Sequence, residues 1–171
     1  NVFASPVNAL SSMMRLCIAG QLALMPASVA ILAPGVNAFR RLRKNLTEPV
    51  FNSWGYNTRS AALRIPCSDD GNRRIEYRLA GADANPYLVA ATILTGMLYG
   101  LEHIDEGDLP EPQHDQPELP LFQQEAIEAF ARCQYLTDSL GDAFSEQWVA
   151  CKLSELDWFE RIVTQEESHL A

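Results

Sequence analysis

The first apolar stretch of the chain has the spacing of one face of a helix. Its apolar positions are Leu10, Met13, Met14, Cys17 and Leu22–Leu24. Ser5 and Pro6 precede them and supply a capping hydroxyl and a proline suited to a first helical position. Because proline disrupts a helix interior, we expect a helix that begins at Ser5-Pro6 and ends at Pro26.

A longer apolar run, residues 16–36, overlaps this helix and resembles a membrane segment in composition. Polar residues and prolines interrupt it at Gln21, Pro26, Ser28 and Pro34. No uninterrupted apolar span of about 18 residues remains, which is the length that a membrane-spanning helix needs. We therefore interpret the run as a helix buried in a folded core and expect no membrane association.

Short segments typical of strands come next. Residues 50–54, 60–65 and 73–79 are separated by turn-forming residues, which predicts three strands. The basic stretch 37–44 before them has no clean period, so we expect it to be a loop. In the third strand, alternation places Arg74, Glu76 and Arg78 on one face.

The second half of the chain is mostly helical in pattern. Asn85-Pro86 is a helix start, and the apolar spacing continues to about His103. An acidic connector with several prolines follows over residues 105–120. Amphipathic patterns then predict helices over residues 122–140, 142–152 and 155–167.

These elements predict an α+β fold with a short antiparallel sheet segment between helices and a helical C-terminus. We divide the chain into arginine-rich strands and helices (1–104), a proline-rich acidic connector (105–120) and C-terminal helices (121–171).

The charge is distributed unevenly. The 171 residues carry a formal net charge of −9, which argues against a general nucleic-acid or anionic-membrane binder. Nevertheless, 10 of the 13 Lys and Arg residues lie within the first 78 residues, together with only 4 of the 22 Asp and Glu residues. An acidic protein with an arginine-rich first segment raises the question of which anion those arginines bind.

Glu76 and its arginine neighbours allow two interpretations. A carboxylate between two guanidiniums is often a surface ion-pair ladder of little energetic consequence. The same set is also suited to a metal–polyphosphate site, in which Glu76 ligates a hard cation and Arg74 and Arg78 bind phosphate or carboxylate oxygens. Arg59 and Arg64 on the neighbouring strand add further donors. The sequence has no glycine-rich phosphate loop, and its histidines lack the spacing of zinc ligands.

Several motifs in this region resemble the C-terminal part of the catalytic domain of the glutamine synthetase superfamily. They are residues 37–41 (NAFRR), 59–66 (RSAALRIP), 74–78 (RIEYR) and 81–88 (GADANPYL). The resemblance extends over essentially the whole chain and implies an enzyme that uses ATP to form γ-glutamyl phosphate, which an amine then attacks. It also implies Mg²⁺ or Mn²⁺ as cofactor, a cytoplasmic location and a homo-oligomeric ring.

Roles for individual residues follow from the resemblance. Glu76 is implied as the metal ligand of this segment, and Arg59, Arg64 and Arg74 as ligands of the ATP phosphates. Arg41 and Arg78 are implied to bind glutamate. Arg59, Glu76 and Arg78 are our candidate catalytic residues.

Two acceptor amines are compatible with the resemblance: ammonia, and a polyamine such as putrescine. Ammonia-dependent glutamine synthetases carry a glutamate in a flap where this chain has Thr47, followed by Glu48. The Trp54-Gly55 pair and the Ala80-Gly81-Ala82-Asp83 form are more similar to γ-glutamylputrescine and other γ-glutamyl-polyamine synthetases. A bulky amine needs the room that a flap carboxylate would fill. A non-catalytic assembly module is the alternative of another class. We expect the isolated chain to be inactive and to self-associate.

Overall fold

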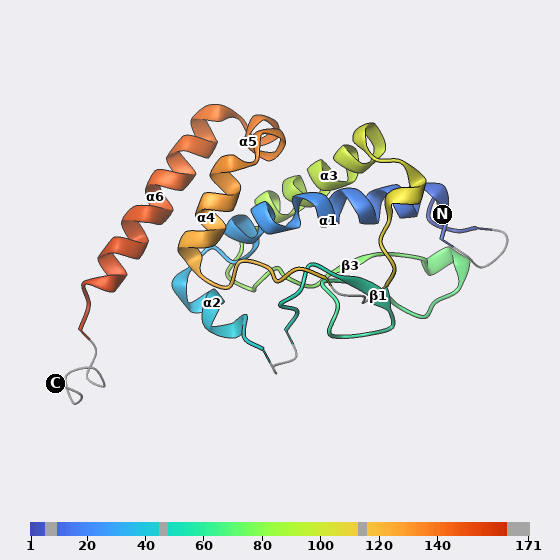
Figure 1. Ribbon diagram of the computed structural model, residues 1–171, viewed down its shortest axis with the longest axis horizontal. Helices are drawn as coiled ribbons and strands as arrows, with labels where there is room; N and C mark the ends of the chain where they lie inside the picture. Colours follow the sequence, from blue (N-terminus) through green and yellow to red (C-terminus); the bar gives the residue numbers. More distant parts are fainter. Residues whose placement is uncertain (6–9, 45–47, 113–115, 164–171) are drawn as a thin grey trace.

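The computed structural model describes residues 1–5, 10–44, 48–112 and 116–163. It contains six α-helices, two short 3₁₀ helices and three strands within these ranges, which confirms the α+β prediction (Figure 1). In chain order they are α1 (Ser12–Leu32), α2 (Val36–Arg41), β1 (Trp54–Tyr56), β2 (Leu63–Ile65), η1 (Asp70–Asn72), β3 (Glu76–Tyr77), α3 (Pro86–His103), η2 (Glu106–Asp108), α4 (Gln123–Arg132), α5 (Gln134–Leu140) and α6 (Asp142–Glu160).

Helix α1 is the centre of the core. It packs beside α3, contacts α4 with its C-terminal half, and lies over the small sheet (Figure 1). Its length and composition would suit a bilayer-spanning helix, but 78% of its most apolar 18-residue window is buried within the structure. Burial on this scale is typical of the core helix that we predicted from the interrupted apolar run.

The predicted boundaries of this helix were wrong at both ends. The described helix begins at Ser12, with the Ser11 hydroxyl accepting a hydrogen bond from Met14 N at 3.2 Å; Pro6 lies outside the described residues. At the other end the helix continues through Pro26 to Leu32. Proline lacks the N–H that would bond the carbonyl four residues earlier. Here the Asn52 side chain donates to that carbonyl instead, with Nδ2 2.9 Å from Leu22 O.

Glycines allow α1 and α3 to approach each other closely. A Cβ on Gly20 would lie 2.2 Å from the carbonyl oxygen of Gly96, and a Cβ on Gly100 would lie 1.9 Å from that of Leu16. Both contacts are with backbone atoms, which cannot move aside as a flexible side chain can. The crossing therefore requires residues without side chains.

The sheet is mixed, whereas we predicted an antiparallel one. β2 pairs antiparallel with β3, but β1 pairs parallel with β2. The physical reason lies in the connection between β1 and β2, which returns the chain to the start of β1 before the second strand begins. Asn57 begins this return with a left-handed φ of 46°, a conformation that asparagine tolerates better than most residues.

Helix lengths elsewhere differ from the sequence pattern. Residues 37–41 of the expected loop belong to the short helix α2, in which Ala38 and Phe39 are buried and anchor it to the core. The predicted helix 122–140 is divided at the non-helical Cys133 into α4 and α5. The two helices predicted after it form one helix, α6, since nothing between residues 152 and 155 breaks it; residues 164–167 lie outside the described part.

Helix α3 begins at Pro86 with Asn85 as its cap, as predicted.

The connector is attached to the rest of the fold at both ends. Leu109 and Leu119 are buried in the core, and the Trp54 indole N–H donates to Pro110 O at 2.7 Å. Phe51 and Glu118 form an isolated antiparallel bridge. These contacts hold in place the segment before β1, which is one of the two edge strands of the sheet.

Candidate active site

The Glu76 carboxylate lies between two guanidiniums. Arg64 Nη1 is 2.8 Å from Glu76 Oε2, while Arg74 Nε and Nη2 are 3.2 and 2.9 Å from Oε1. The sheet creates the first contact, because Arg64 on β2 is the register partner of Glu76 on β3. Arg74 reaches the same carboxylate from two residues earlier along the chain.

These contacts keep Glu76 ionised. Burial raises the pKa of its carboxyl, but the hydrogen bonds and charges of Arg64 and Arg74 outweigh burial and hold the pKa below its ordinary value. Arg64 is fixed further by Asn57, whose Oδ1 accepts from Nη2 at 2.7 Å. Sequence reasoning assigned Asn57 only to a turn, and the asparagine in the Gly-Tyr-Asn turn was the one available signal for this contact.

Two arginines in this region carry buried donors that no described residue satisfies. These are Nε of Arg64 and Nη1 of Arg78. Arg78 follows Glu76 by two residues, and its backbone N–H extends the β2–β3 pairing by donating to Ala62 O at 2.9 Å. Since buried polar groups in proteins are normally hydrogen-bonded, unsatisfied guanidinium donors beside a polar cluster indicate a place for an anion.

Arg41 lies at the end of α2 and reaches the end of the third strand segment. Its Nη2 donates to Leu79 O at 3.2 Å, and its Nη1 is 3.3 Å from Glu48 Oε2. A Cβ on Gly81 would lie 3.0 Å from Arg41 Nη2, so the glycine leaves room for the guanidinium. Thr47, at the flap position, lies outside the described residues.

Arg59 is not part of this cluster. It lies in the bend before β2 with an exposed side chain, and it makes no ion pair with any residue that the structure describes. The structure therefore brings together Arg64, Arg74 and Glu76, and places Arg41 and Arg78 at the same end of the third strand segment. Arg59 stays apart.

The cluster alone does not form a metal centre. Among the described residues, no three His, Cys, Asp or Glu side chains gather closely enough to hold a metal ion. Both Glu76 oxygens already accept hydrogen bonds from arginines, and Mg²⁺ requires about six oxygen ligands. Glu76 fits the role of one carboxylate ligand in a centre whose other ligands come from outside these residues.

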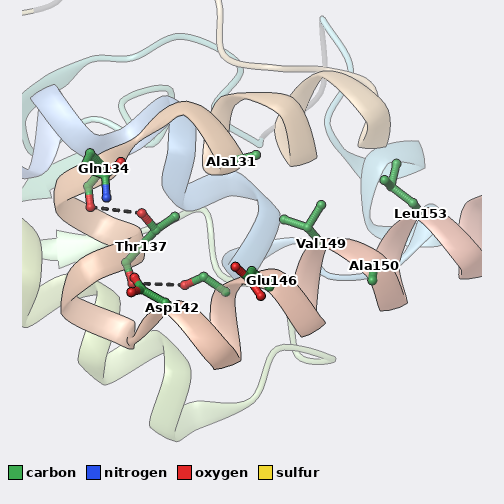
Figure 2. Close-up of a pocket in the computed structure, with 9 residues that line it drawn as sticks. Ala131, Gln134, Thr137, Asp142, Glu146, Val149, Ala150 and Leu153 are labelled. Atoms are coloured by element: carbon green, nitrogen blue, oxygen red, sulfur yellow. Dashed lines mark hydrogen bonds between the residues drawn. The ribbon is translucent and has the colours of Figure 1, made fainter.

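A separate cavity of about 620 Å³ lies between α5 and α6 (Figure 2). Figure 2 shows Asp142 and Glu146 at one end of it and Val149, Ala150 and Leu153 along the other. Among the described residues its lining has no arginine or lysine, so it offers no charge-assisted donor to a phosphate or a substrate carboxylate. The candidate active site is therefore the cluster at the sheet and not this cavity.

Comparison with known proteins agrees with this geometry. The family described as "Glutamine synthetase, catalytic domain" matches residues 1–170. The γ-glutamylputrescine synthetase of Escherichia coli (strain K12) is 42% identical over 173 residues, which cover 98% of this chain and 36% of that protein.

Two further relatives match with lower identity. Lengsin of Mus musculus is 35% identical over 151 residues, covering 82% of this chain and 26% of lengsin. The glutamine synthetase of Pyrococcus woesei is 32% identical over 165 residues, covering 90% of this chain and 37% of that protein.

The chain thus spans between about a quarter and two-fifths of the length of these relatives. Its match to the family nevertheless runs from end to end and includes each of the motifs on which the arginines and Glu76 lie. The chain belongs to the glutamine synthetase catalytic-domain family.

Proposed function

We propose that this chain is the C-terminal portion of an ATP-dependent ligase that joins glutamate to an amine through γ-glutamyl phosphate. The observation that carries the proposal is the Glu76 carboxylate held between Arg64 and Arg74, with unsatisfied donors on Arg64 and Arg78 beside it. Phosphoryl transfer depends on such fixed cations, because they stabilise the negative charge on the transferring group.

Each residue has a role in the proposed reaction. Arg64 and Arg74 bind ATP phosphates. Arg59, which lies apart from them in the bend before β2, would contact the phosphates as a separate ligand. Arg41 and Arg78 bind the carboxylate of glutamate and orient it toward the nucleotide. Glu76 contributes one ligand to Mg²⁺ or Mn²⁺; the bound metal neutralises charge on the phosphates. Arg59, Glu76 and Arg78 are the proposed catalytic residues.

We propose a polyamine such as putrescine as the acceptor. A relative named γ-glutamylputrescine synthetase shares 42% identity over 98% of this chain, against 32% for a relative named glutamine synthetase. The position that carries a flap glutamate in ammonia-dependent enzymes is Thr47 here. A missing carboxylate leaves room for a longer amine.

Assays of the full-length protein with ATP, glutamate and either putrescine or ammonia would identify its acceptor amine. We expect phosphate release and γ-glutamyl amide formation with putrescine, and much less with ammonia. Equal turnover with ammonia would favour a glutamine synthetase and overturn the polyamine proposal.

The same assay distinguishes a ligase from a non-catalytic module. The Glu76→Gln variant of the full-length protein should lose activity, while Glu128→Gln, on the exposed surface of α4, should keep it. Absence of turnover with every amine in the unmodified protein would support the non-catalytic alternative. The isolated 171-residue chain should release no phosphate, since Glu76 is the one metal ligand that we propose for its described residues.

We further propose that the full-length protein is a cytoplasmic homo-oligomer that binds neither nucleic acid nor membranes. A ring would complete active sites between neighbouring subunits. Light scattering coupled to size-exclusion chromatography measures the mass directly, and a monomer would contradict this part of the proposal.

A further inference from the structure

A second arginine-containing site includes Arg40, the residue before Arg41 on α2. The helix is six residues long, and consecutive arginines on it point to different neighbours. Arg41 contacts Leu79 at the sheet, while the Arg40 guanidinium carbon lies 5.5 Å from the ring centroid of Phe159 on α6. Arg40 therefore belongs to a different surface from the candidate active site.

That surface contains a cavity of about 430 Å³ with an apolar wall. Phe39 and Leu42 form its inner side and are buried, and Leu121 and Phe122 form its outer side. Phe122 is 69% exposed although it is an aromatic residue directly before α4. The volume lies within the range of small-molecule sites, which is about 300–1,000 Å³.

The rim of this cavity is cationic. Arg40, Arg43 and Lys44 line it, and among the described lining residues there is no Asp or Glu. Lys44 forms an ion pair with Glu118, and Arg40 contacts the Phe159 ring. The Arg43 side chain is exposed and makes no ion pair or side-chain hydrogen bond with any residue in the described ranges. The cavity thus retains uncompensated positive charge next to apolar surface.

We propose that this cavity binds a free small molecule that combines an aromatic or alkyl body with one anionic group. Its apolar body packs between Phe39 and Phe122, which removes exposed aromatic surface from water. Its carboxylate, sulfonate or phosphate group accepts hydrogen bonds from Arg43, with Arg40 and Lys44 adding charge. The proposal does not depend on the ligase activity.

A pair of probes with the same ring system tests both features. 8-Anilinonaphthalene-1-sulfonate carries the anionic group, and N-phenyl-1-naphthylamine lacks it. Titrated into the full 171-residue chain and followed by fluorescence, the sulfonate should bind more tightly than the neutral probe, and its affinity should fall as salt screens the rim. Equal affinities for the two probes would overturn the proposal.

Matched substitutions then locate the site. Arg43→Gln should weaken sulfonate binding about tenfold, the scale of one hydrogen bond to a charged group, and leave the neutral probe unchanged. Arg132→Gln removes an exposed arginine from α4 and should change neither. Phe122→Ala should weaken both probes, whereas Leu94→Ala, on the exposed face of α3, should not. An equal effect of Arg43→Gln and Arg132→Gln, or of Phe122→Ala and Leu94→Ala, would place the probe elsewhere.

Discussion

Arg64 and Glu76 face each other across the antiparallel pair β2–β3, and their side chains meet at 2.8 Å between Nη1 and Oε2. Twelve positions separate them in the sequence. The pairing of two short strands thus converts two isolated polar residues into a single charged unit, which Arg74 completes from the other side.

This unit makes the stability of the chain depend on pH in the acid range. The pKa of Glu76 is below its ordinary value in the folded chain, so its contribution is fully present above about pH 4.5 and is lost as pH falls through the lower folded pKa. Urea unfolding at a series of acidic pH values should show a smaller decrease in unfolding free energy for Glu76→Gln than for the unmodified chain. Identical pH profiles would contradict the contacts with Arg64 and Arg74.

The α1–α3 crossing should not tolerate a methyl group. Gly100→Ala places a Cβ 1.9 Å from Leu16 O, and the two helices must separate to accommodate it. We expect a loss of about 3 kcal/mol in unfolding free energy, at the upper end of overpacking effects. Gly107→Ala is the control, because a Cβ there meets nothing within 4 Å. Urea denaturation of both variants measures the difference, and similar midpoints would show that the crossing is looser than described.

The Leu22 carbonyl has no backbone donor because Pro26 lacks an N–H, so we expect the stability of the chain to depend on the Asn52 amide that donates to it. Asn52→Asp replaces the donor to Leu22 O with a carboxylate oxygen, and we expect a loss of about 2 kcal/mol in unfolding free energy. Asn37→Asp, at an exposed position, should cost little.

A second substitution makes this prediction specific. Pro26→Ala restores a backbone N–H four residues after Leu22, so it should recover stability in the Asn52→Asp background. If thermal unfolding of the double variant shows no recovery, the Leu22 carbonyl is not the reason for the loss.

Tyr135 on α5 should lose its proton at a higher pH than an ordinary tyrosine because its hydroxyl contacts the Glu102 carboxylate on α3. Its hydroxyl donates to Glu102 Oε2 at 2.7 Å, and this hydrogen bond, followed by burial, raises the pKa of Tyr135 to about 12. The stabilisation that the pair provides is therefore present below about pH 10, the ordinary tyrosine value, and is lost as pH rises toward the folded pKa.

Ultraviolet absorbance during an alkaline titration follows phenolate formation. Glu102→Gln should shift the Tyr135 transition toward the ordinary value, and Tyr135→Phe should remove that transition. Burial also raises the pKa of Tyr77, so a late transition from Tyr77 should persist in both variants. A Glu102→Gln titration that overlays the unmodified one would contradict the contact.

The predicted elements were most accurate where the local sequence decides them. Helix α3 begins at Pro86 because Asn85 caps it, and its pattern ends with His103 as expected. The proximity of Arg74 to Glu76 was predicted from their spacing, although β3 is shorter than the predicted strand and Arg74 lies just before it. The family motifs were visible in the same way, since residue types at fixed spacing are a property of the sequence.

Other features required the folded chain. Pro26 predicted the end of a helix, but α1 continues through it, and the Leu22 carbonyl accepts a hydrogen bond from Asn52, which is 26 positions after Pro26. The direction of β1 relative to β2 depends on a bend at Asn57, and the sequence pattern of a strand does not encode direction.

The candidate site also has some features that the sequence determines and others that only the fold determines. By itself, the sequence determined that arginines, one glutamate and the family motifs occur together in the first half of the chain. The tertiary structure decided which of them meet: Arg64 and Arg74 bind Glu76, Arg41 reaches Leu79, and Arg59 stays exposed in a bend. The physical reason is that residue type and spacing are local, whereas register, helix crossing and the partner of each charge depend on long-range packing.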